Sequence, residues 1–355
     1  MSQNGYIRLY QSSSEPEEAY LLARGNVYFF VSEVDKYVIR GQNLIVGATE
    51  LILGNMTDIS TPRMETAITD HNSRIKKMPR EKFIASLGNY SFVLNASMVL
   101  AKQVTLTNNI MNKNMTSLEG DDKKIKELSV EFYRIVRRIK DEYGKRKLPW
   151  LKDVTVKHEN TLTYKRGETF DRSSEPTVIS AECTMEDKSR EFPTGTVICE
   201  AGSQGDEMYI LESGAIDVVI KGNRVATISD RGTVFGEMAL LLGETRSATL
   251  KAKNDVVLTA ISKKDLREIA ARNTDILTAI AVSLAKKHYF NIEKINSVNE
   301  MLIEKELHGD EEKLEKKRKE LQHTTSELLS LKKDVRTMHS TKPAEFIDDL
   351  VDTFD

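Results

Sequence analysis

Residues 235–249 read F-G-E-M-A-L-L-L-G-E-T-R-S-A-T, and the rest of the chain is organised around them. Gly236 lets the backbone approach a ligand closely because it has no Cβ. The apolar turn that starts at Met238 predicts a short helix, whose free N–H groups suit an anion. Arg246 follows a few residues later and offers a fork of donors to phosphate oxygens. The stretch therefore predicts an anion site between a helix start and one arginine.

Glu237 lies beside this predicted anion site and would repel a phosphate, so it needs a different target. A carboxylate only accepts hydrogen bonds, and a sugar hydroxyl is the natural donor to it. Glu237 and Arg246 together predict a ligand in which a phosphate is joined to a ribose. The alternative is a surface turn that carries an incidental Glu and Arg.

The stretch resembles the phosphate-binding cassette of cyclic nucleotide-binding domains, whose pattern is roughly F-G-E-[LM]-A-L-…-R-[AST]-A-T. It departs from that pattern at Thr245, where the family usually has proline. The resemblance implies that Glu237 holds the ribose 2′-hydroxyl, that Arg246 holds the cyclic phosphate, and that two backbone amides assist. The residues expected to bind the nucleotide are Gly236, Glu237, Met238, Ala239, Arg246, Ser247, Ala248 and Asn291.

The sequence around the cassette predicts a small antiparallel β-roll followed by helices. Short alternating runs between residues 192 and 261 are separated by turns. Residues 246–298 are similar to the sensor domain of bacterial catabolite-activator proteins, in which a helix residue near Asn291 contacts the adenine. The alternative for Asn291 is a polar residue on the surface of a helix. Those activators continue into a helix-turn-helix, whereas a Lys/Glu-rich helix follows here, so we expect no DNA-binding domain.

The identity of the base stays open between cyclic AMP and cyclic GMP. In the family, a hydroxyl residue directly after the arginine can favour guanine, and Ser247 is such a residue. Bacterial activators with serine at that position bind cyclic AMP, and we favour cyclic AMP as the regulatory ligand.

An internal repeat connects the first part of the chain with this domain. Residues 19–25 align with residues 208–214 at an offset of 189, and Gly47 meets Gly236 at the same offset. Arg63 meets Arg246 at an offset of 183, which implies an insertion in the loop before it. The first 110 residues are therefore expected to be a divergent second copy of the β-roll.

The first copy is expected to be a pseudo-site that does not bind the same ligand. Ala48 stands where Glu237 stands, so the acceptor for a sugar hydroxyl is missing. Glu65 stands where Ala248 stands and brings a carboxylate to the phosphate subsite. We interpret Arg63 as a structural residue that forms a salt bridge with Glu65.

Composition excludes several classes of function. The net charge of -2 shows no bias toward nucleic acid, and no run of about eighteen apolar residues predicts a membrane span. The start of the chain lacks a secretion signal, and Cys183 and Cys199 form no C-x-x-C pair, so we expect a cytoplasmic protein. The six histidines show no metal-ligand spacing, and no nucleophile–base set or Walker loop appears, so we expect neither a metal site nor an enzyme.

The expected fold class is α+β, with two cyclic-nucleotide-binding-type antiparallel β-rolls, flanking helices, a helical connector and a coiled-coil-like C-terminal helix. The expected domains are a divergent roll at 1–110, a helical connector at 111–155, a cyclic nucleotide-binding domain at 156–299, a charged helix at 300–340 and an acidic tail at 341–355. We expect the tail to be frayed, and the alternative is that it docks on a partner.

Apolar residues at seven-residue spacing mark the C-terminal helix, and they predict a homodimer through C-terminal helices. They are Leu307, Leu314, Leu321, Leu328 and Val335. The preceding helix is better furnished for a dimer contact, with apolar residues at Ile276, Ile280, Leu284, Ile292, Ile295, Val298 and Leu302. The alternative is that this stripe folds back on its own chain. The expected function is a cyclic mononucleotide sensor that signals through its helices to a protein partner. A structural coiled-coil or scaffold protein whose rolls no longer bind ligand is the competing hypothesis.

Overall fold

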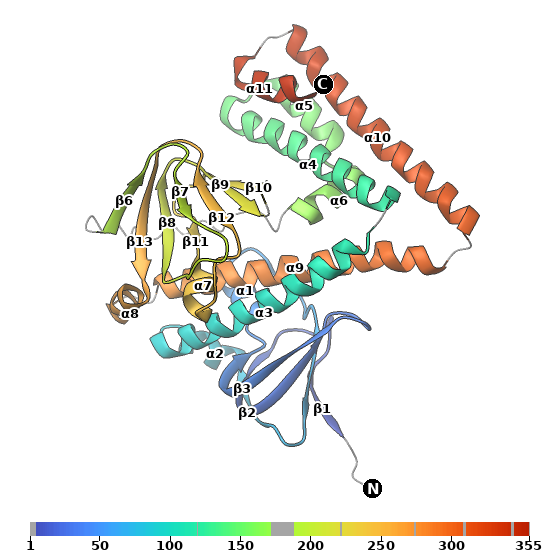
Figure 1. Cartoon of the computed structure of the whole chain (residues 1–355). Coiled ribbons are helices and arrows are strands. Elements are labelled where there is room, and N and C mark those ends of the chain that lie inside the picture. Colours follow the sequence, from blue (N-terminus) through green and yellow to red (C-terminus); the bar gives the residue numbers. More distant parts are fainter. Residues whose placement is uncertain are drawn as a thin grey trace. The chain divides into compact units, whose positions relative to one another are not determined.

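The computed structural model describes residues 5–118, 120–171, 188–220, 222–272, 275–307, 310–341 and 344–354. The chain forms two compact units. The first combines residues 1–110 with 176–292, and the second combines residues 111–175 with 293–355. Helices and antiparallel sheets are both abundant (Figure 1), so the α+β class is confirmed.

The N-terminal roll of the first unit is a single antiparallel sheet in the order β1-β4-β2-β3, with β5 also paired to β2. Its strands are β1 (Tyr6–Tyr10), β2 (Glu18–Phe30), β3 (Lys36–Val46), β4 (Thr66–Asp70) and β5 (Arg74–Pro79). The short helix α1 (Thr49–Met56) connects β3 to β4, and α2 (Arg80–Ser86) and α3 (Tyr90–Thr116) follow the last strand.

The second roll consists of two four-stranded antiparallel sheets, in the orders β10-β9-β12-β7 and β11-β8-β13-β6. Its strands are β6 (Ser189–Phe192), β7 (Val197–Cys199), β8 (Glu207–Ser213), β9 (Ile216–Ile220), β10 (Asn223–Ile228), β11 (Val234–Phe235), β12 (Thr249–Ala252) and β13 (Val256–Ser262). Helix α7 (Glu237–Leu242) lies between β11 and β12, and α8 (Lys263–Arg272) and α9 (Asp275–Leu307) follow. Residues 172–187 and 273–274 of the domain expected at 156–299 lie outside the described residues.

One hydrophobic core joins the two rolls of the first unit through helices α3 and α9. Leu277, Ile280 and Leu284 recur along α9 at helical spacing and are fully buried. The same core contains Leu51 of α1 and Leu240 of α7. Figure 1 shows α3 and α9 running between the two rolls. The short helices α1 and α7, one from each roll, therefore contribute to the same core as the long helices α3 and α9.

The second unit is built from helices α4 (Gly120–Arg146), α5 (Pro149–His158), α6 (Leu162–Asp171) and α10 (Asp310–Thr341). As the three- and four-residue spacing predicts, α4 buries Ile125, Phe132, Ile135 and Ile139. Residues 162–171, which we expected in the second roll's domain, form α6 and group with this helical unit.

The apolar stripe of α10 is covered within its own chain. Leu328 and Val335 are buried in a cluster with α4 and α5, while the side chains of Leu307 and Leu314 lie outside the described residues. A homodimer through the C-terminal helices stays a prediction, while the described part of the stripe folds back on its own chain. The physical reason is that one apolar residue per heptad is enough to dock on α4 but too thin for a coiled coil.

The C-terminal tail is ordered, which corrects the expectation of a frayed end. It forms short helical turns at Glu345–Ile347, Asp348–Val351 and Asp352–Phe354. Ile347 is fully buried and Phe354 is nearly so, both in the core of the second unit. Burial of these apolar side chains therefore stabilises the tail against the second unit, although the tail carries several acidic residues.

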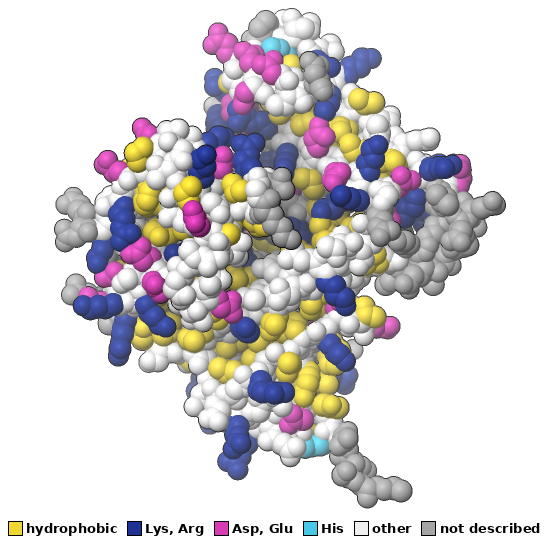
Figure 2. Space-filling view, in the orientation of Figure 1, with side chains coloured by type: hydrophobic (Ala, Val, Ile, Leu, Met, Phe, Trp, Pro, Cys, Tyr) yellow, Lys and Arg dark blue, Asp and Glu magenta, His cyan; other side chains and the backbone are white. Residues whose placement is uncertain are grey.

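Among the described residues, no single helix has the length and hydropathy to cross a membrane. Helices α2 and α3 meet at an angle of 109°, and only the two together reach the length and composition of a membrane span. Figure 2 shows both acidic and basic side chains on the face that it draws, and the net charge of the chain is -2.

Candidate functional site

The turn between β11 and α7 is shaped by Gly236. Its backbone is left-handed, with φ 78° and ψ 1°, directly before the first residue of α7. A Cβ at this position would lie 2.4 Å from Nη1 of Arg246. Only glycine fits this conformation and this close approach without strain, so the sequence places the arginine against the turn.

Arg246 is buried, with 7% of its surface exposed, and it fastens the turn to the sheet. Nη1 donates to the carbonyl of Gly236 at 3.1 Å, and Nη2 donates to the carbonyl of Glu207 at 2.5 Å. Its Nε is buried and has no hydrogen-bond partner among the described residues. A buried guanidinium N–H with no acceptor is costly, and an anionic ligand oxygen would supply one.

The loop before β8 holds the backbone of Arg246 from the other side. The N–H of Arg246 donates to the carbonyl of Ser203 at 2.8 Å, and its carbonyl accepts from the N–H of Gly202 at 2.8 Å. Gly205 of the same loop approaches α7 closely, since a Cβ there would lie 2.2 Å from the Cβ of Ala239. The loop, α7 and Arg246 thus form one compact cradle.

Glu237, the first residue of α7, is only 1% exposed. Lys287 of α9 donates to its Oε1 in an ion pair whose side chains are 30% and 2% exposed for Lys287 and Glu237. A buried carboxylate needs such a partner, because burial of an unpaired charge costs several kcal/mol. Sequence reasoning missed Lys287, which lies fifty residues away on another element.

The other cassette residues occupy the expected places around this cradle. Ala239 is buried in α7 and Met238 is half-buried beside it. Ser247 is exposed and Ala248 is half-buried, on the path from Arg246 into β12. The structure therefore brings Gly236, Glu237, Met238, Ala239, Arg246, Ser247 and Ala248 together.

Asn291 is not part of this group, which corrects its expected contact with a base. It is 4% exposed and lies on the face of α9 that packs on α3. Its Nδ2 donates to Thr107 Oγ1 at 3.1 Å and to Asn108 Oδ1 at 3.0 Å. The amide is thus used in helix packing, because burial against α3 demands local hydrogen-bond partners.

The N-terminal roll repeats the arginine geometry of the second roll. Arg63 donates through Nη1 to the carbonyl of Gly47 at 2.9 Å and through Nη2 to the carbonyl of Glu18. Gly47 and Glu18 precede Gly236 and Glu207 by 189 residues, the offset of the repeat. The two rolls share this buried detail, so the first roll is a divergent copy of the second.

In the first roll, however, a carboxylate of the protein itself fills the cradle. Glu50 Oε2 lies 2.8 Å from Nη1 of Arg63, and Oε1 accepts from the N–H of Met64 at 3.1 Å. Glu50 stands 189 residues before Ala239, so it arises from α1 where the second roll has a methyl group. The expected salt bridge of Arg63 with Glu65 is wrong, because Glu50 takes the guanidinium instead.

Glu65 belongs to a buried polar network that includes α9. It accepts from Tyr37 Oη at 2.7 Å. His288 of α9 lies within 3.1 Å of the same Oη through Nε2 and within 2.8 Å of Thr49 Oγ1 through Nδ1. Burial raises the pKa of Glu65 to about 8 and lowers the pKa of His288 to about 4. Near neutral pH this network is therefore a set of mostly uncharged groups linking α9 to the first roll.

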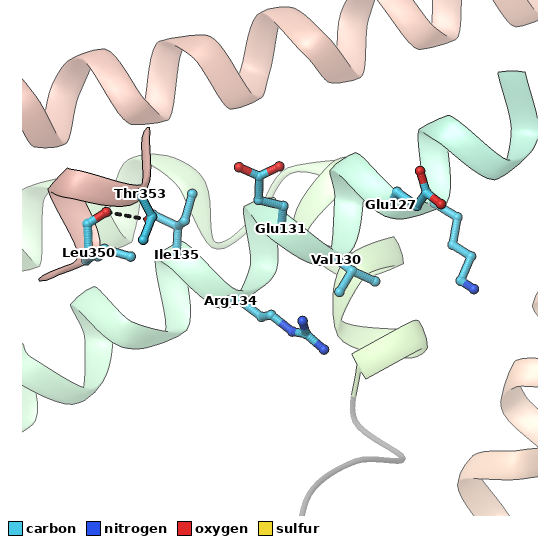
Figure 3. A pocket seen from close by; sticks show the side chains of 8 residues that line it. Glu127, Val130, Glu131, Arg134, Ile135, Leu350 and Thr353 are labelled. Carbon is cyan, nitrogen blue, oxygen red and sulfur yellow. Dashed lines mark hydrogen bonds between the residues drawn. The ribbon is translucent and has the colours of Figure 1, made fainter. Parts of the chain in front are cut away.

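A pocket of about 440 Å³ lies in the second unit, between α4 and the C-terminal tail. Figure 3 shows Glu127, Glu131 and Arg134 of α4 around it, with Leu350 and Thr353 of the tail on one side. Arg134 is already paired with Asp171 at 2.7 Å. The pocket contains none of the cassette residues. Among the described residues, no group of acidic, histidine or cysteine side chains could hold a metal ion.

Comparison with known proteins finds similarity in the segment of the chain that contains the cradle. Residues 189–273 match the family model of the cyclic nucleotide-binding domain. A regulatory subunit of cAMP-dependent protein kinase from Candida albicans is 34% identical over 131 residues, which are 36% of this chain and 27% of that protein. The subunit from Debaryomyces hansenii is 34% identical over 133 residues, which are 36% of this chain and 28% of that protein. The chain thus spans little more than a quarter of the length of these relatives.

Among solved structures, the chain is similar to one described as cAMP bound PfPKA-R (141-441). The identity is 18%, the match covers 84% of this chain and 78% of that chain, and the TM-score is 0.25. A TM-score this low supports no argument about the whole chain. Gly236, Glu237 and Arg246 lie within the matched segment, so residues 189–273 resemble a cyclic nucleotide-binding domain in both sequence and local geometry.

Proposed function

We propose that the chain is a cyclic nucleotide sensor whose second roll binds one cyclic mononucleotide, with cyclic AMP favoured over cyclic GMP. The observation that carries the proposal is the buried pair of Glu237 and Arg246 on either side of the Gly236 turn. The first roll has no such pair, because Ala48 stands where the second roll has Glu237.

Each of these residues has a defined task toward the nucleotide. The guanidinium of Arg246 offers charge-assisted hydrogen bonds to the equatorial oxygens of the cyclic phosphate. The Gly236 turn lets backbone amides of α7 approach the same oxygens without a Cβ in the way. Glu237 accepts a hydrogen bond from the ribose 2′-hydroxyl, since an ionised carboxylate is an acceptor only.

The output that we propose is regulation of a protein partner through helices, not catalysis by the chain. Helix α9 begins in the first unit at Asp275 and continues without a break into the second unit, ending at Leu307. A change at the nucleotide site therefore has a continuous element along which to travel. The relatives are regulatory subunits of a kinase, and we propose a comparable regulatory role, with a kinase catalytic subunit as one candidate partner.

The N-terminal roll, in this proposal, binds no nucleotide. The Glu50 carboxylate makes the contacts to Arg63 and to a backbone amide that a phosphate would make. A second anion there would meet like charge in a buried site. The chain should therefore bind one nucleotide, in the second roll alone.

Titration calorimetry of the full chain with cyclic AMP, cyclic GMP and a cyclic dinucleotide tests the proposal. We expect saturable binding of a cyclic mononucleotide with a stoichiometry of one per chain, tightest for cyclic AMP. A stoichiometry of two would contradict the pseudo-site. Absence of heat with every nucleotide, on protein shown to be folded by circular dichroism, would favour the competing hypothesis of a structural protein.

A further inference from the structure

The residue that faces the ribose acceptor from α9 is Lys287. Its ammonium group donates to Glu237, and the Glu237 side chain is only 2% exposed beneath it. A ribose hydroxyl can reach a carboxylate only if part of that carboxylate is uncovered. Lys287 is 30% exposed and has a long flexible chain, so it can move aside at low cost.

We propose that Lys287 is an internal competitor of the ribose, which releases Glu237 when a nucleotide binds. The inference rests on the proposed function of the second roll and describes how its site is regulated. The carboxylate of Glu237 is almost fully buried with Lys287 on its Oε1, so the 2′-hydroxyl, a second donor, gains access to it when the ammonium withdraws. Binding therefore exchanges one partner of Glu237 for another and frees the lysine of α9.

The neighbouring residue shows what this exchange does to α9. Consecutive helix residues point about 100° apart, so Lys287 and His288 face different rolls. His288 is fully buried and lies against Thr49 and Tyr37 of the first roll. Loss of the Lys287–Glu237 pair loosens α9 from the second roll, while His288 keeps it fastened to the first. A ligand that breaks only one of two attachments shifts the balance between two positions of the helix.

A second ion pair joins a long helix to the α7 region, and it is more exposed than the Lys287–Glu237 pair. Lys102 of α3 also approaches the second roll, but it pairs with Glu244 at 3.4 Å and both side chains are nearly half exposed. Such an exposed pair contributes little. Because Glu237 is buried, the Lys287 pair is the stronger of these two ion pairs.

The test compares Lys287→Met, Lys287→Arg and Lys286→Met with the unaltered full chain, using calorimetry with cyclic AMP and with 2′-deoxy cyclic AMP. Met keeps the length of the side chain and removes its charge, and Arg keeps the charge. Lys286 is the preceding residue on α9, is half-buried and makes no ion pair among the described residues, so it is the matched control. Circular dichroism and thermal unfolding confirm that each variant is folded.

We expect Lys287→Met to tighten binding of cyclic AMP about tenfold, the scale of one hydrogen bond to a charged group. The 2′-deoxy nucleotide cannot use Glu237, so its affinity should change less and the preference for the ribose should widen. Lys287→Arg and Lys286→Met should bind like the unaltered chain. Binding of cyclic AMP by Lys287→Met but not by the unaltered chain would also support the competition.

Unchanged or weaker binding of cyclic AMP by Lys287→Met would overturn the inference while leaving the proposed function intact. An equal shift for both nucleotides would also overturn it, because a merely structural effect does not distinguish the 2′-hydroxyl. Failure of every variant and of the unaltered chain to bind either nucleotide would overturn both the inference and the proposed function.

Discussion

Glu50 and Arg63 form a buried ion pair, with Oε2 and Nη1 2.8 Å apart and side chains 2% and 1% exposed. Removal of one partner leaves the other as an uncompensated buried charge, which costs about 3–5 kcal/mol. We therefore expect Glu50→Ala to lower the free energy of unfolding by about that amount, measured by urea denaturation.

The control for this prediction is an exposed pair on α8, Lys264 and Glu268, whose side chains are 84% and 62% exposed. Lys264→Ala should change stability by less than about 1 kcal/mol. A loss of similar size in both variants would mean that the Glu50 pair is no stronger than a surface pair.

Arg246→Ala should weaken binding of cyclic AMP by on the order of 1.5–3 kcal/mol, because a charge-assisted contact to the phosphate is lost. Arg224 of the same roll is the control, since its side chain is 61% exposed and lies 3.9 Å from Asp217. Arg224→Ala should bind normally. Arg246 also holds the carbonyls of Gly236 and Glu207, so thermal unfolding must accompany the titration. Equal affinity in both variants would remove Arg246 from the binding site.

Stability should fall as the pH rises from about 6.5 to about 8, owing to Glu65. The folded state raises the pKa of this carboxyl from 4.5 to about 8 by burial, so the folded state binds the proton that the unfolded chain has already lost. The stabilising contribution is complete below pH 4.5 and is lost as the pH rises through 8. The slope should reach at most about 1.4 kcal/mol per pH unit.

His288 acts in the opposite direction at lower pH. Burial lowers its pKa from 6.5 to about 4, so its contribution is complete above pH 6.5 and is lost as the pH falls through 4. Between 6.5 and 8 only Glu65 of these two groups titrates. Urea denaturation at several pH values should show the alkaline decline in the unaltered chain and not in Glu65→Gln. An equal decline in the variant would assign it to another group.

Leu328→Ala should lower the free energy of unfolding by about 2–5 kcal/mol, the usual cost of a cavity in a core. Its neighbour Leu329 is 62% exposed against 4% for Leu328, so Leu329→Ala should change stability by less than about 0.5 kcal/mol. Since Leu328 packs within its own chain, the loss should be the same at every protein concentration. A loss that grows on dilution would indicate that the stripe joins two chains.

The cassette was predictable from sequence because its parts are contiguous. Gly236, Glu237 and Arg246 fall within eleven residues, and local chemistry dictates a turn, an acceptor and a phosphate donor at that spacing. The helical connector was predictable for a similar reason, since the spacing of Ile125 and Phe132 reveals one buried face.

The partners of these residues were not predictable, because they come from other elements. Lys287 meets Glu237 only after α9 packs on the second roll, and no sequence pattern fixes which side of α9 faces it. Glu50 did carry a signal: at the repeat offset it replaces Ala239, and a carboxylate in place of that methyl group indicates a filled cradle. Proximity in sequence suggested Glu65 as the partner of Arg63 instead, although α1 supplies a better placed carboxylate.

The carboxylate of Glu50 has a consequence for how steeply the chain can respond. The Glu50 carboxylate is part of the chain, so it occupies the site beside Arg63 at every nucleotide concentration. The state of the first roll therefore does not depend on nucleotide. In the proposed function only the second roll binds nucleotide, and one site per chain gives a simple hyperbolic response without cooperativity inside the chain. The fraction of chains in the bound state would then rise gradually with nucleotide concentration, without a sharp threshold.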